Sequence, residues 1–325
     1  MGSALSPMRQ AFPGKATFTD KNVPDLTNKV IIVTGANTGL GKELAQILYS
    51  KNAKVYMMAR SEEKTKAAID SIRTAVPNSR GDMIYLRLDL ADLPSIKTSA
   101  EEFLRREQQL HVLFNNAGVG YPERGSKTKQ GYELQLGVNC IGTFAFTKML
   151  TPTLVSTAKV SPRNTVRVVW VSSSAAEGIS LKGYMESLPN IEQKSGFQQY
   201  CTSKLGNYFH ATEFAARHKA DGVLAIPLNP GNLDSDFWRS QGPFMTWFLR
   251  KTVLFPPIYG AYTQLFAAFS PKVTPEMSGH FLAPWGRFWN VSKHMIAASK
   301  SQSEGGTGVA RQFWDWTEFQ VNLHI

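Results

Sequence analysis

Residues 30–41 read VIIVTGANTGLG and pass from a continuously apolar, β-branched run to three closely spaced glycines. Such a run is typical of a parallel strand that is buried on both faces. After the glycines, apolar residues recur at helical spacing, at Leu44, Ala45, Ile47 and Leu48. A strand, a glycine turn and a helix in this order leave backbone N–H groups free at a helix N-terminus, which favours an anion such as a pyrophosphate. The stretch indicates a nucleotide site; a turn that only closes a strand–helix unit is the alternative.

The spacing of the three glycines excludes one kind of nucleotide site. A P-loop requires the pattern G-x-x-x-x-G-K-[ST]. Gly41-Lys42 matches its end, but Glu43 stands where a serine or threonine must hold magnesium, and Ala36 stands where the first glycine must be. The remaining interpretation is a dinucleotide-binding turn with the spacing G-x-x-x-G-x-G.

The composition is that of an ordinary globular chain of 325 residues, with 42% hydrophobic and 19% charged residues. No run approaches the roughly 18–20 apolar residues that cross a bilayer, and the N-terminus does not resemble a secretory signal. We therefore expect a cytoplasmic protein without a transmembrane segment. The two cysteines, Cys140 and Cys201, have no metal-binding spacing, so neither a metal site nor a disulfide framework is predicted.

The chain carries a formal charge of +11 and has a pI near 9.6. A basic excess attracts nucleic acids and anionic membrane surfaces. However, the lysines and arginines are spread along the chain, with no run of five. An anionic cofactor explains the balance at least as well, and no nucleic-acid-binding motif is present, so we expect no nucleic-acid partner.

Apolar, β-branched runs alternate with helical patterns along most of the chain. The strand candidates are residues 30–34, 54–59, 82–88, 111–114, 166–171 and 223–228. This alternation predicts a parallel sheet with helices on both faces. Right-handed crossovers then give a Rossmann-like, doubly wound α/β fold of three layers, with the ligand crevice at the carboxyl ends of the strands.

The apolar pattern and the composition along the chain also predict the domain organisation. Residues 1–28 lack periodic apolar residues and are predicted to form an N-terminal arm, pinned by Phe18 and Leu26. Residues 29–325 are predicted to form one domain, whose C-terminal extension from Trp238 onward contains six of the seven tryptophans. In this extension we expect a helix over 257–269, a last strand over 279–282 and a closing helix over 311–321.

The end of the second strand bears on the choice of cofactor. A carboxylate at this place binds a free ribose 2′-hydroxyl, whereas an arginine suits a 2′-phosphate. Here the strand ends in Ala59-Arg60, and a guanidinium pairs well with a phosphate. Arg60 therefore favours NADPH over NADH, and Lys64 would add charge. A solvated arginine at a strand end, and a surface lysine, are the alternatives.

Four further motifs follow in order along the chain. They are Asn115-Asn116-Ala117-Gly118, the serines Ser172-Ser173-Ser174, the pattern Tyr200-Cys201-Thr202-Ser203-Lys204, and Pro230-Gly231. With the glycine turn they resemble the short-chain dehydrogenase/reductase family over about residues 29–235. The stretches TGANTGLGK and YCTSKLGN are similar to those of the retinol dehydrogenase-like branch and its fungal relatives, most of which use NADP(H).

The residue types of these motifs suit acid–base chemistry. Tyr200 and Lys204 are one helical turn apart and so share a face. A nearby ammonium and a positively charged nicotinamide would bring the tyrosine pKa down from about 10 toward the working range. Ser173 would hydrogen-bond the substrate oxygen, with Ser172 or Ser174 as the alternative serine.

The resemblance implies further roles. Tyr200 passes the proton, Lys204 also holds the nicotinamide ribose, and Asn139 completes a proton relay through water; without the family, Asn139 could simply cap or kink its helix. Asp89 meets adenine, unless it only caps the next helix. The other implied cofactor residues are Gly35, Asn37, Thr38, Gly39, Leu40, Gly41, Leu90, Asn116, Ala117, Gly118, Pro230, Gly231, Leu233 and Ser235.

Two segments are candidates for the substrate side. The loop after the serines contains the apolar residues Ile179, Leu181, Tyr184, Met185 and Leu188, and residues 232–260 form a candidate lid that contains Phe237, Trp238, Phe244, Met245, Trp247, Phe248 and Phe255. Their aromatic and methionine content suits a pocket or lid for a bulky apolar substrate. Ordinary packing and a membrane-contacting hairpin are the alternatives.

These observations together predict an NADP(H)-dependent oxidoreductase that interconverts a ketone or aldehyde and an alcohol. We expect reduction of a bulky apolar or aromatic carbonyl compound, as in secondary metabolism. A non-catalytic dinucleotide-binding sensor or scaffold, and a retinol- or steroid-type alcohol dehydrogenase at a membrane surface, are the alternatives. The sequence makes no prediction of the oligomeric state.

Overall fold

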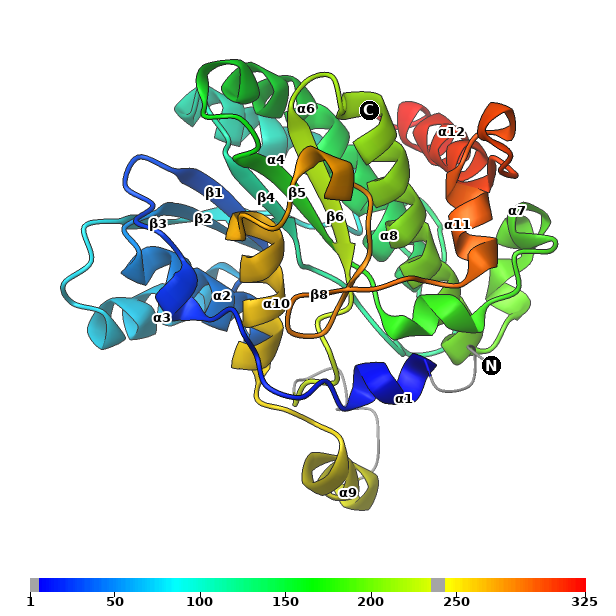
Figure 1. Ribbon diagram of the computed structural model, residues 1–325, viewed down its shortest axis with the longest axis horizontal. Helices are drawn as coiled ribbons and strands as arrows, with labels where there is room; N and C mark the ends of the chain where they lie inside the picture. The colour runs from blue at the N-terminus through cyan, green and yellow to red at the C-terminus, as the bar shows by residue number, and fades with distance from the viewer. Residues whose placement is uncertain (1–5, 235–242) are drawn as a thin grey trace.

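The computed structural model describes residues 6–234 and 243–325, which include an eight-stranded sheet (Figure 1). The strand order is β3-β2-β1-β4-β5-β6-β7-β8, and all neighbours are parallel except β7 and β8. The strands are β1 (Val30–Thr34), β2 (Lys54–Ala59), β3 (Asp82–Arg87), β4 (Val112–Asn115), β5 (Val166–Val171), β6 (Val223–Leu228), β7 (Leu282–Ala283) and β8 (Arg287–Phe288). The order reverses between β1 and β4, where a doubly wound fold forms its ligand crevice. The predicted fold is confirmed.

Helices cover both faces of the sheet. They are α1 (Ser6–Ala11), α2 (Gly39–Ser50), α3 (Glu62–Ala75), α4 (Leu93–Arg106), α5 (Leu134–Leu136), α6 (Thr143–Val160), α7 (Tyr184–Ser187), α8 (Gly196–His218), α9 (Pro243–Thr252), α10 (Pro257–Phe269), α11 (Lys293–Ser299) and α12 (Val309–Asn322). Ile31 and Val33 of β1 belong to an apolar cluster with α2, α3 and α10. Ile32 belongs to a second cluster with α4, α6 and α8. Because successive side chains of a strand point to opposite faces, burial on both faces explains the continuous apolar run.

The predicted element bounds agree closely with the structure along the sheet. β1, β2, β5, β6 and α10 have the predicted bounds. β3 ends one residue early, although the N–H of Leu88 still donates to the carbonyl of Ala59 at 3.1 Å. β7 begins three residues later than expected, and β8 was not predicted, because a strand of two residues is too short to show a period.

The N-terminal arm lies against the domain. Phe18 and Leu26 are buried, and the ring of Phe18 packs edge-to-face on Phe266 with centroids 5.6 Å apart. The arm also contains α1, which the sequence did not predict. Figure 1 shows α1 at the same edge of the molecule as the segment that follows β6.

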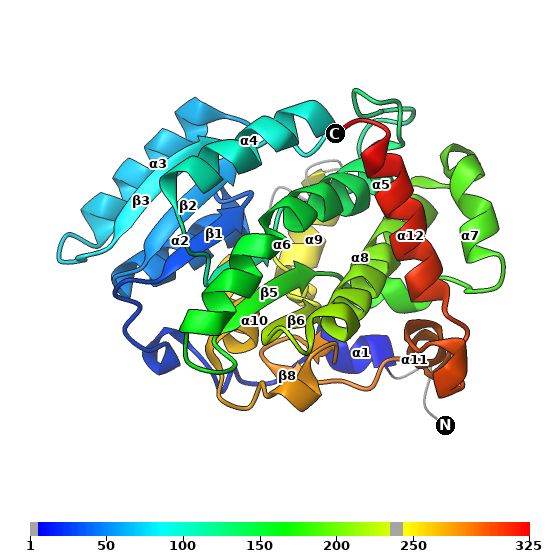
Figure 2. The same cartoon turned by 90° about the horizontal axis from the view of Figure 1, so that it is seen from above.

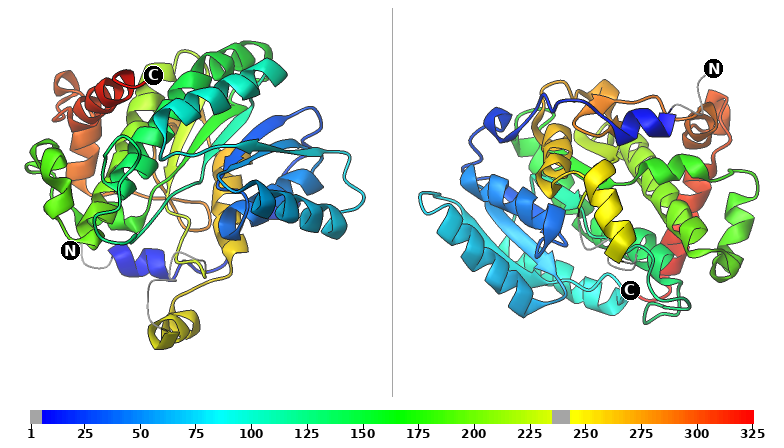
Figure 3. Two further views of the ribbon diagram at one scale, coloured as in Figure 1. Left: turned by 180° about the vertical axis from the view of Figure 1, so that it is seen from behind. Right: turned by 90° about the horizontal axis from the view of Figure 1, so that it is seen from below.

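The C-terminal extension packs against the helices of the domain, and part of it lines the ligand crevice. α12 packs along α8, and Figure 2 shows the two helices side by side. α9 is set apart from the sheet in Figure 1 and in the left view of Figure 3. Within the described residues, no helix has the length and apolar character needed to cross a membrane.

We expect the protein to lose stability below about pH 6.5 partly through His111. Its Nδ1 accepts a hydrogen bond from the N–H of Val30 at 3.1 Å, and burial lowers its pKa to about 4. The unfolded chain binds a proton below about 6.5 but the folded chain only near 4, so the free energy of unfolding falls as the pH falls through this window. The contribution is about 2 kcal/mol between pH 7.5 and 5.

Urea unfolding at both pH values measures this loss. His111→Gln, whose side-chain oxygen can accept the same hydrogen bond, should reduce the difference in unfolding free energy, whereas His280→Gln, at an exposed histidine, should not. His210 is also buried, and its pKa is lowered to about 3. It should therefore cause part of the loss of stability at low pH in every variant. An equal loss in wild type and His111→Gln would contradict the prediction.

Candidate functional site

A cavity of about 1450 Å³ opens at the carboxyl ends of the parallel strands. It exceeds the roughly 300–1000 Å³ of a usual small-molecule pocket, so it has room for a dinucleotide and a second molecule. All of the predicted cofactor residues line it except Ser235, which lies outside the described residues. Ser173, Tyr200 and Lys204 line the same cavity. The structure thus brings the glycine turn and the catalytic candidates together, while their roles stay predictions.

The glycine turn has the geometry of an anion cradle. Gly35 and Gly39 have φ values of +67° and +50°, which favour glycine. A Cβ added at Gly41 would collide with the carbonyl oxygen of Gly35. α2 begins at Gly39, and among the described residues the N-cap side chain of Thr38 makes no capping hydrogen bond. First-turn N–H groups of α2 are therefore left for an anion in the cavity.

A polar clamp holds the neighbouring turn after β4 against this cradle. The side-chain nitrogen of Asn116 donates to the carbonyl of Thr34 at 2.9 Å, and its side-chain oxygen accepts from Gln264 at 2.9 Å. The hydroxyl of Thr34 accepts from the N–H of Ala117 at 2.9 Å. The sequence analysis missed Gln264, although a glutamine in the apolar stretch of α10 is the signal that could have revealed it.

Two cations reach the end of the cavity beside β2. Arg60 follows β2 directly and Lys64 lies in the first turn of α3, and both are exposed and line the cavity. Asp89 lines it as well, and its Oδ1 accepts from the N–H of Ala91 at 3.1 Å. The N-cap residue of α4 is Asp92, so the alternative that Asp89 only caps the next helix is wrong.

Ser173, Tyr200 and Lys204 form a connected polar group. The side chain of Ser173 hydrogen-bonds the hydroxyl of Tyr200. One turn further along α8, the Nζ of Lys204 lies 5.8 Å from the centre of the Tyr200 ring and donates to the carbonyl of Val171 at 2.9 Å. Burial lowers the pKa of Lys204 to about 8. This arrangement can hold a carbonyl oxygen and exchange a proton with it.

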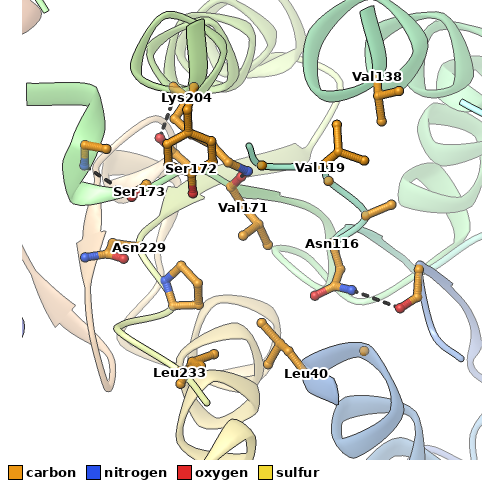
Figure 4. Close-up of a pocket in the computed structure, with 18 of the residues that line it drawn as sticks. Leu40, Asn116, Val119, Val138, Val171, Ser172, Ser173, Lys204, Asn229 and Leu233 are labelled. Atoms are coloured by element: carbon orange, nitrogen blue, oxygen red, sulfur yellow. Dashed lines mark hydrogen bonds between the residues drawn. The ribbon is translucent and has the colours of Figure 1, made fainter. Parts of the chain in front are cut away.

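Ser172 and Ser173 have different hydrogen-bond partners (Figure 4). The hydroxyl of Ser172 donates to the carbonyl of Lys204 at 2.7 Å and is buried. The hydroxyl of Ser173 accepts from the N–H of Ala175 at 3.1 Å, which leaves its proton for another acceptor. Ser174 also lines the cavity, but the hydrogen bond to Tyr200 comes from Ser173. The contacts favour Ser173 over its neighbours.

Tyr200 is covered on one side by Tyr121, a residue that the sequence analysis missed. The two rings stack with centroids 5.5 Å apart and an angle of 27° between their planes. Tyr121 has a φ of +50°, which is uncommon for a bulky residue, and its N–H donates to Gln135 at 3.2 Å. A tyrosine shortly after the Asn-Asn-Ala-Gly motif was the only sequence signal.

The pKa of Tyr200 lies above its ordinary value in this structure. Removal of the hydroxyl from water raises it, and the hydrogen bond from Ser173 opposes that rise. The predicted lowering by Lys204 and a nicotinamide ring requires a bound cofactor and stays a prediction. A raised pKa keeps the phenol protonated at neutral pH, as a proton donor needs.

Asn139 braces the site from a stretch of π-helix, Gly137–Gly142. Its side-chain nitrogen donates to the carbonyl of Val119 and to the hydroxyl of Ser203, both at 2.9 Å, and its oxygen accepts from the N–H of Val119 at 2.8 Å. The side chain therefore fixes the segment after β4. Asn139 does not line the cavity, and its predicted place in a water relay stays a prediction.

The turn after β6 closes the cavity from the opposite side. Gly231 has a φ of +99°, and its N–H donates to the side chain of Asn229 at 3.1 Å. Leu233 bridges to Phe255 in parallel, and Arg250 of α9 pairs with Asp234 at 2.9 Å. These contacts join the two ends of the candidate lid to each other, beside the cavity that Leu233 lines. Phe237 and Trp238 lie outside the described residues, and the side chains of Phe244, Met245 and Phe248 are not described.

The predicted wall after Ser173 is mostly packing. Tyr184 and Leu188 are buried, and Ile179, Leu181 and Met185 pack against the same apolar cluster with α8, α11 and α12. None of these five lines the cavity. The ordinary-packing alternative is therefore correct for them, because α11 and α12 cover this loop. The cavity wall instead contains Tyr121, Glu177, Phe197, Val291 and His294.

No group of three or more His, Cys, Asp or Glu side chains suited to a metal occurs in the part of the chain that the structure describes.

The chain is similar in sequence to known proteins. The family model described as short chain dehydrogenase matches residues 29–245. A short-chain dehydrogenase/reductase of Phomopsis amygdali is 52% identical, covering 97% of this chain and 96% of its own. The short-chain dehydrogenase/reductase bet4 of Neocamarosporium betae is 46% identical, covering 97% and 93%.

Solved structures share the fold. The crystal structure of an uncharacterized protein from Mycobacterium paratuberculosis has a TM-score of 0.67 at 26% identity, covering 95% of this chain and 98% of that one. The RhlG/NADP active-site complex of Pseudomonas aeruginosa has a TM-score of 0.63 at 21% identity, covering 79% and 94%.

Proposed function

Because the chain belongs to the short-chain dehydrogenase/reductase family, we propose that this oxidoreductase uses NADP(H) to reduce a ketone or aldehyde to an alcohol in the cytoplasm. The observation that carries the proposal is the Ser173–Tyr200 hydrogen bond beside Lys204 in a cavity that also contains the glycine turn. A dinucleotide-binding scaffold would need the glycine turn but not this catalytic group.

The donor set fits a dinucleotide with a 2′-phosphate. The cradle around Gly41 and the first turn of α2 would hold the pyrophosphate, and Asn116 to Gly118 would lie against the adenine ribose. Arg60 and Lys64 would bind the 2′-phosphate, since no carboxylate stands at the end of β2. The RhlG complex with NADP shares the fold and is compatible with this assignment.

Each catalytic side chain has one task in the proposed reaction. Hydride transfer to the carbonyl carbon is the chemistry that a bound NADPH supplies. Ser173 donates a hydrogen bond to the substrate oxygen, where negative charge develops. Tyr200 gives its proton to that oxygen. Lys204 holds a positive charge beside the tyrosine and favours the phenolate that remains.

The remaining lining supports a bulky, partly aromatic substrate. Tyr121, Phe197 and Val291 offer apolar surface at the catalytic end, and Phe197 is 56% exposed. The resemblance to fungal relatives supports a place in secondary metabolism. NADPH consumption measured with a panel of aromatic and aliphatic ketones tests the proposal. Consumption by none of them, with intact NADPH binding, would favour the non-catalytic sensor or scaffold.

We expect Arg60→Asp to reverse the cofactor preference. The substitution removes a charge-assisted hydrogen bond to the 2′-phosphate and places a carboxylate where a free 2′-hydroxyl can be bound. The ratio of kcat/KM for NADPH to that for NADH should fall by about 100-fold. Arg87→Asp is the matched control, because Arg87 is the β3 neighbour of Ala59 but does not line the cavity. An unchanged ratio in Arg60→Asp would remove Arg60 from this role.

A further inference from the structure

The N-terminal helix α1 places one buried polar side chain beside the cavity. Gln10 is 2% exposed, although it lies in a six-residue helix of the arm. It also lies outside residues 29–245, which match the family model. Burying an amide without partners is unfavourable, so its hydrogen bonds identify what it does there.

Gln10 joins two segments that flank the catalytic group. Its side-chain nitrogen donates to the carboxylate of Glu177 at 2.9 Å, and its side-chain oxygen accepts from the side-chain nitrogen of Asn229 at 3.0 Å. Glu177 lies four residues after Ser173, and Asn229 directly precedes Pro230-Gly231. Both partners line the cavity.

The rest of the arm fixes the position of Gln10. The guanidinium of Arg287 donates to the carbonyl of Arg9 at 3.0 Å, which attaches the end of α1 to β8. Pro13 and Phe18 are buried further along the arm. The amide is therefore held between the two cavity segments from outside the sheet.

We propose that Gln10 is a positioning residue that ties the Ser173–Glu177 segment to the Asn229–Gly231 turn and so sets the shape of the substrate end of the cavity. The arm is then a part of the active site. The consequence for turnover rests on the proposed reductase activity, whereas the tie between the two segments does not.

The chemistry of the site requires an amide at this position. One side-chain end must donate to a carboxylate while the other accepts from an asparagine, which neither a lysine nor a glutamate can do. A carboxylate at position 10 would face that of Glu177. Exchanging the two residue types would restore the contact, with the amide of position 177 donating to the carboxylate of position 10.

The experiment compares Gln10→Ala, Gln10→Glu and the double variant Gln10→Glu/Glu177→Gln with wild type. Arg9→Ala is the matched control, because Arg9 contacts Arg287 through its backbone carbonyl and its side chain is exposed. Hydrogen–deuterium exchange of the cofactor-free protein is the first measurement. Peptides covering 174–180 and 229–234 should exchange about tenfold faster in both single variants, while peptides of β1 and β5 keep their rates.

Steady-state kinetics is the second measurement, with NADPH and the best carbonyl compound of the panel. The single variants should raise KM for the carbonyl compound about tenfold. The double variant should regain most of the loss relative to Gln10→Glu. Uniformly faster exchange, unchanged exchange at both segments, or no recovery in the double variant would overturn the proposal. If the wild type consumes no NADPH, the proposed function is refuted. The exchange measurement alone then decides whether Gln10 holds the two segments together.

Discussion

Tyr200→Phe is expected to lower kcat for carbonyl reduction by about 1000-fold or more while the Kd for NADPH stays within about twofold. The substitution removes only the hydroxyl that Ser173 contacts, and the ring can keep its stacking on Tyr121. Without that hydroxyl the developing oxyanion loses the group to which the proposal assigns the proton transfer. Stopped-flow turnover and NADPH fluorescence titration measure the two quantities separately.

A matched control lies two helical turns further along α8. Tyr208 is a second tyrosine of α8; it is buried, and its hydroxyl hydrogen-bonds Ser299. Tyr208→Phe should leave kcat within about threefold of wild type, because the change is equal in size but outside the cavity. Near-normal turnover in Tyr200→Phe would assign the proton to another group.

The parts of the fold that the sequence could predict are those with a local signature. A run buried on both faces, such as Val30 to Val33, is continuously apolar, and that continuity is visible in the sequence without tertiary information. Gly41 is equally local, because the collision that excludes a Cβ involves Gly35, six residues away. Local motifs of this kind identified the predicted cofactor residues, and the structure places nearly all of them in one cavity.

The parts that could not be predicted depend on contacts between distant segments. Gln264 supports Asn116 across 148 residues, and Gln10 meets Asn229 across 219 residues. Tyr184 was assigned to a pocket because an apolar loop beside a site looks the same whether it faces a ligand or a neighbouring helix. Only the position of α11 and α12 over that loop separates the two cases.

Lys204→Met is expected to lower kcat by about 100- to 1000-fold and to raise the Kd for NADPH by about tenfold. The ammonium beside Tyr200 favours the phenolate left after proton transfer, and a methionine of similar length provides no charge. Lys194→Met removes an exposed charge just before α8 and serves as the control, with little change expected.

The pH profile of the wild-type enzyme tests the same charge without a substitution. Burial lowers the pKa of Lys204 to about 8, so the ammonium is lost as the pH rises through 8, well below the ordinary value of 10.5. If this protonation state persists in the complex with NADPH, kcat should fall about tenfold for each pH unit above it. The residual activity of Lys204→Met should lack this fall between pH 7 and 9.5. A parallel decline in wild type and variant would mean that another group, such as Tyr200, titrates, and that the lysine acts by position rather than by charge.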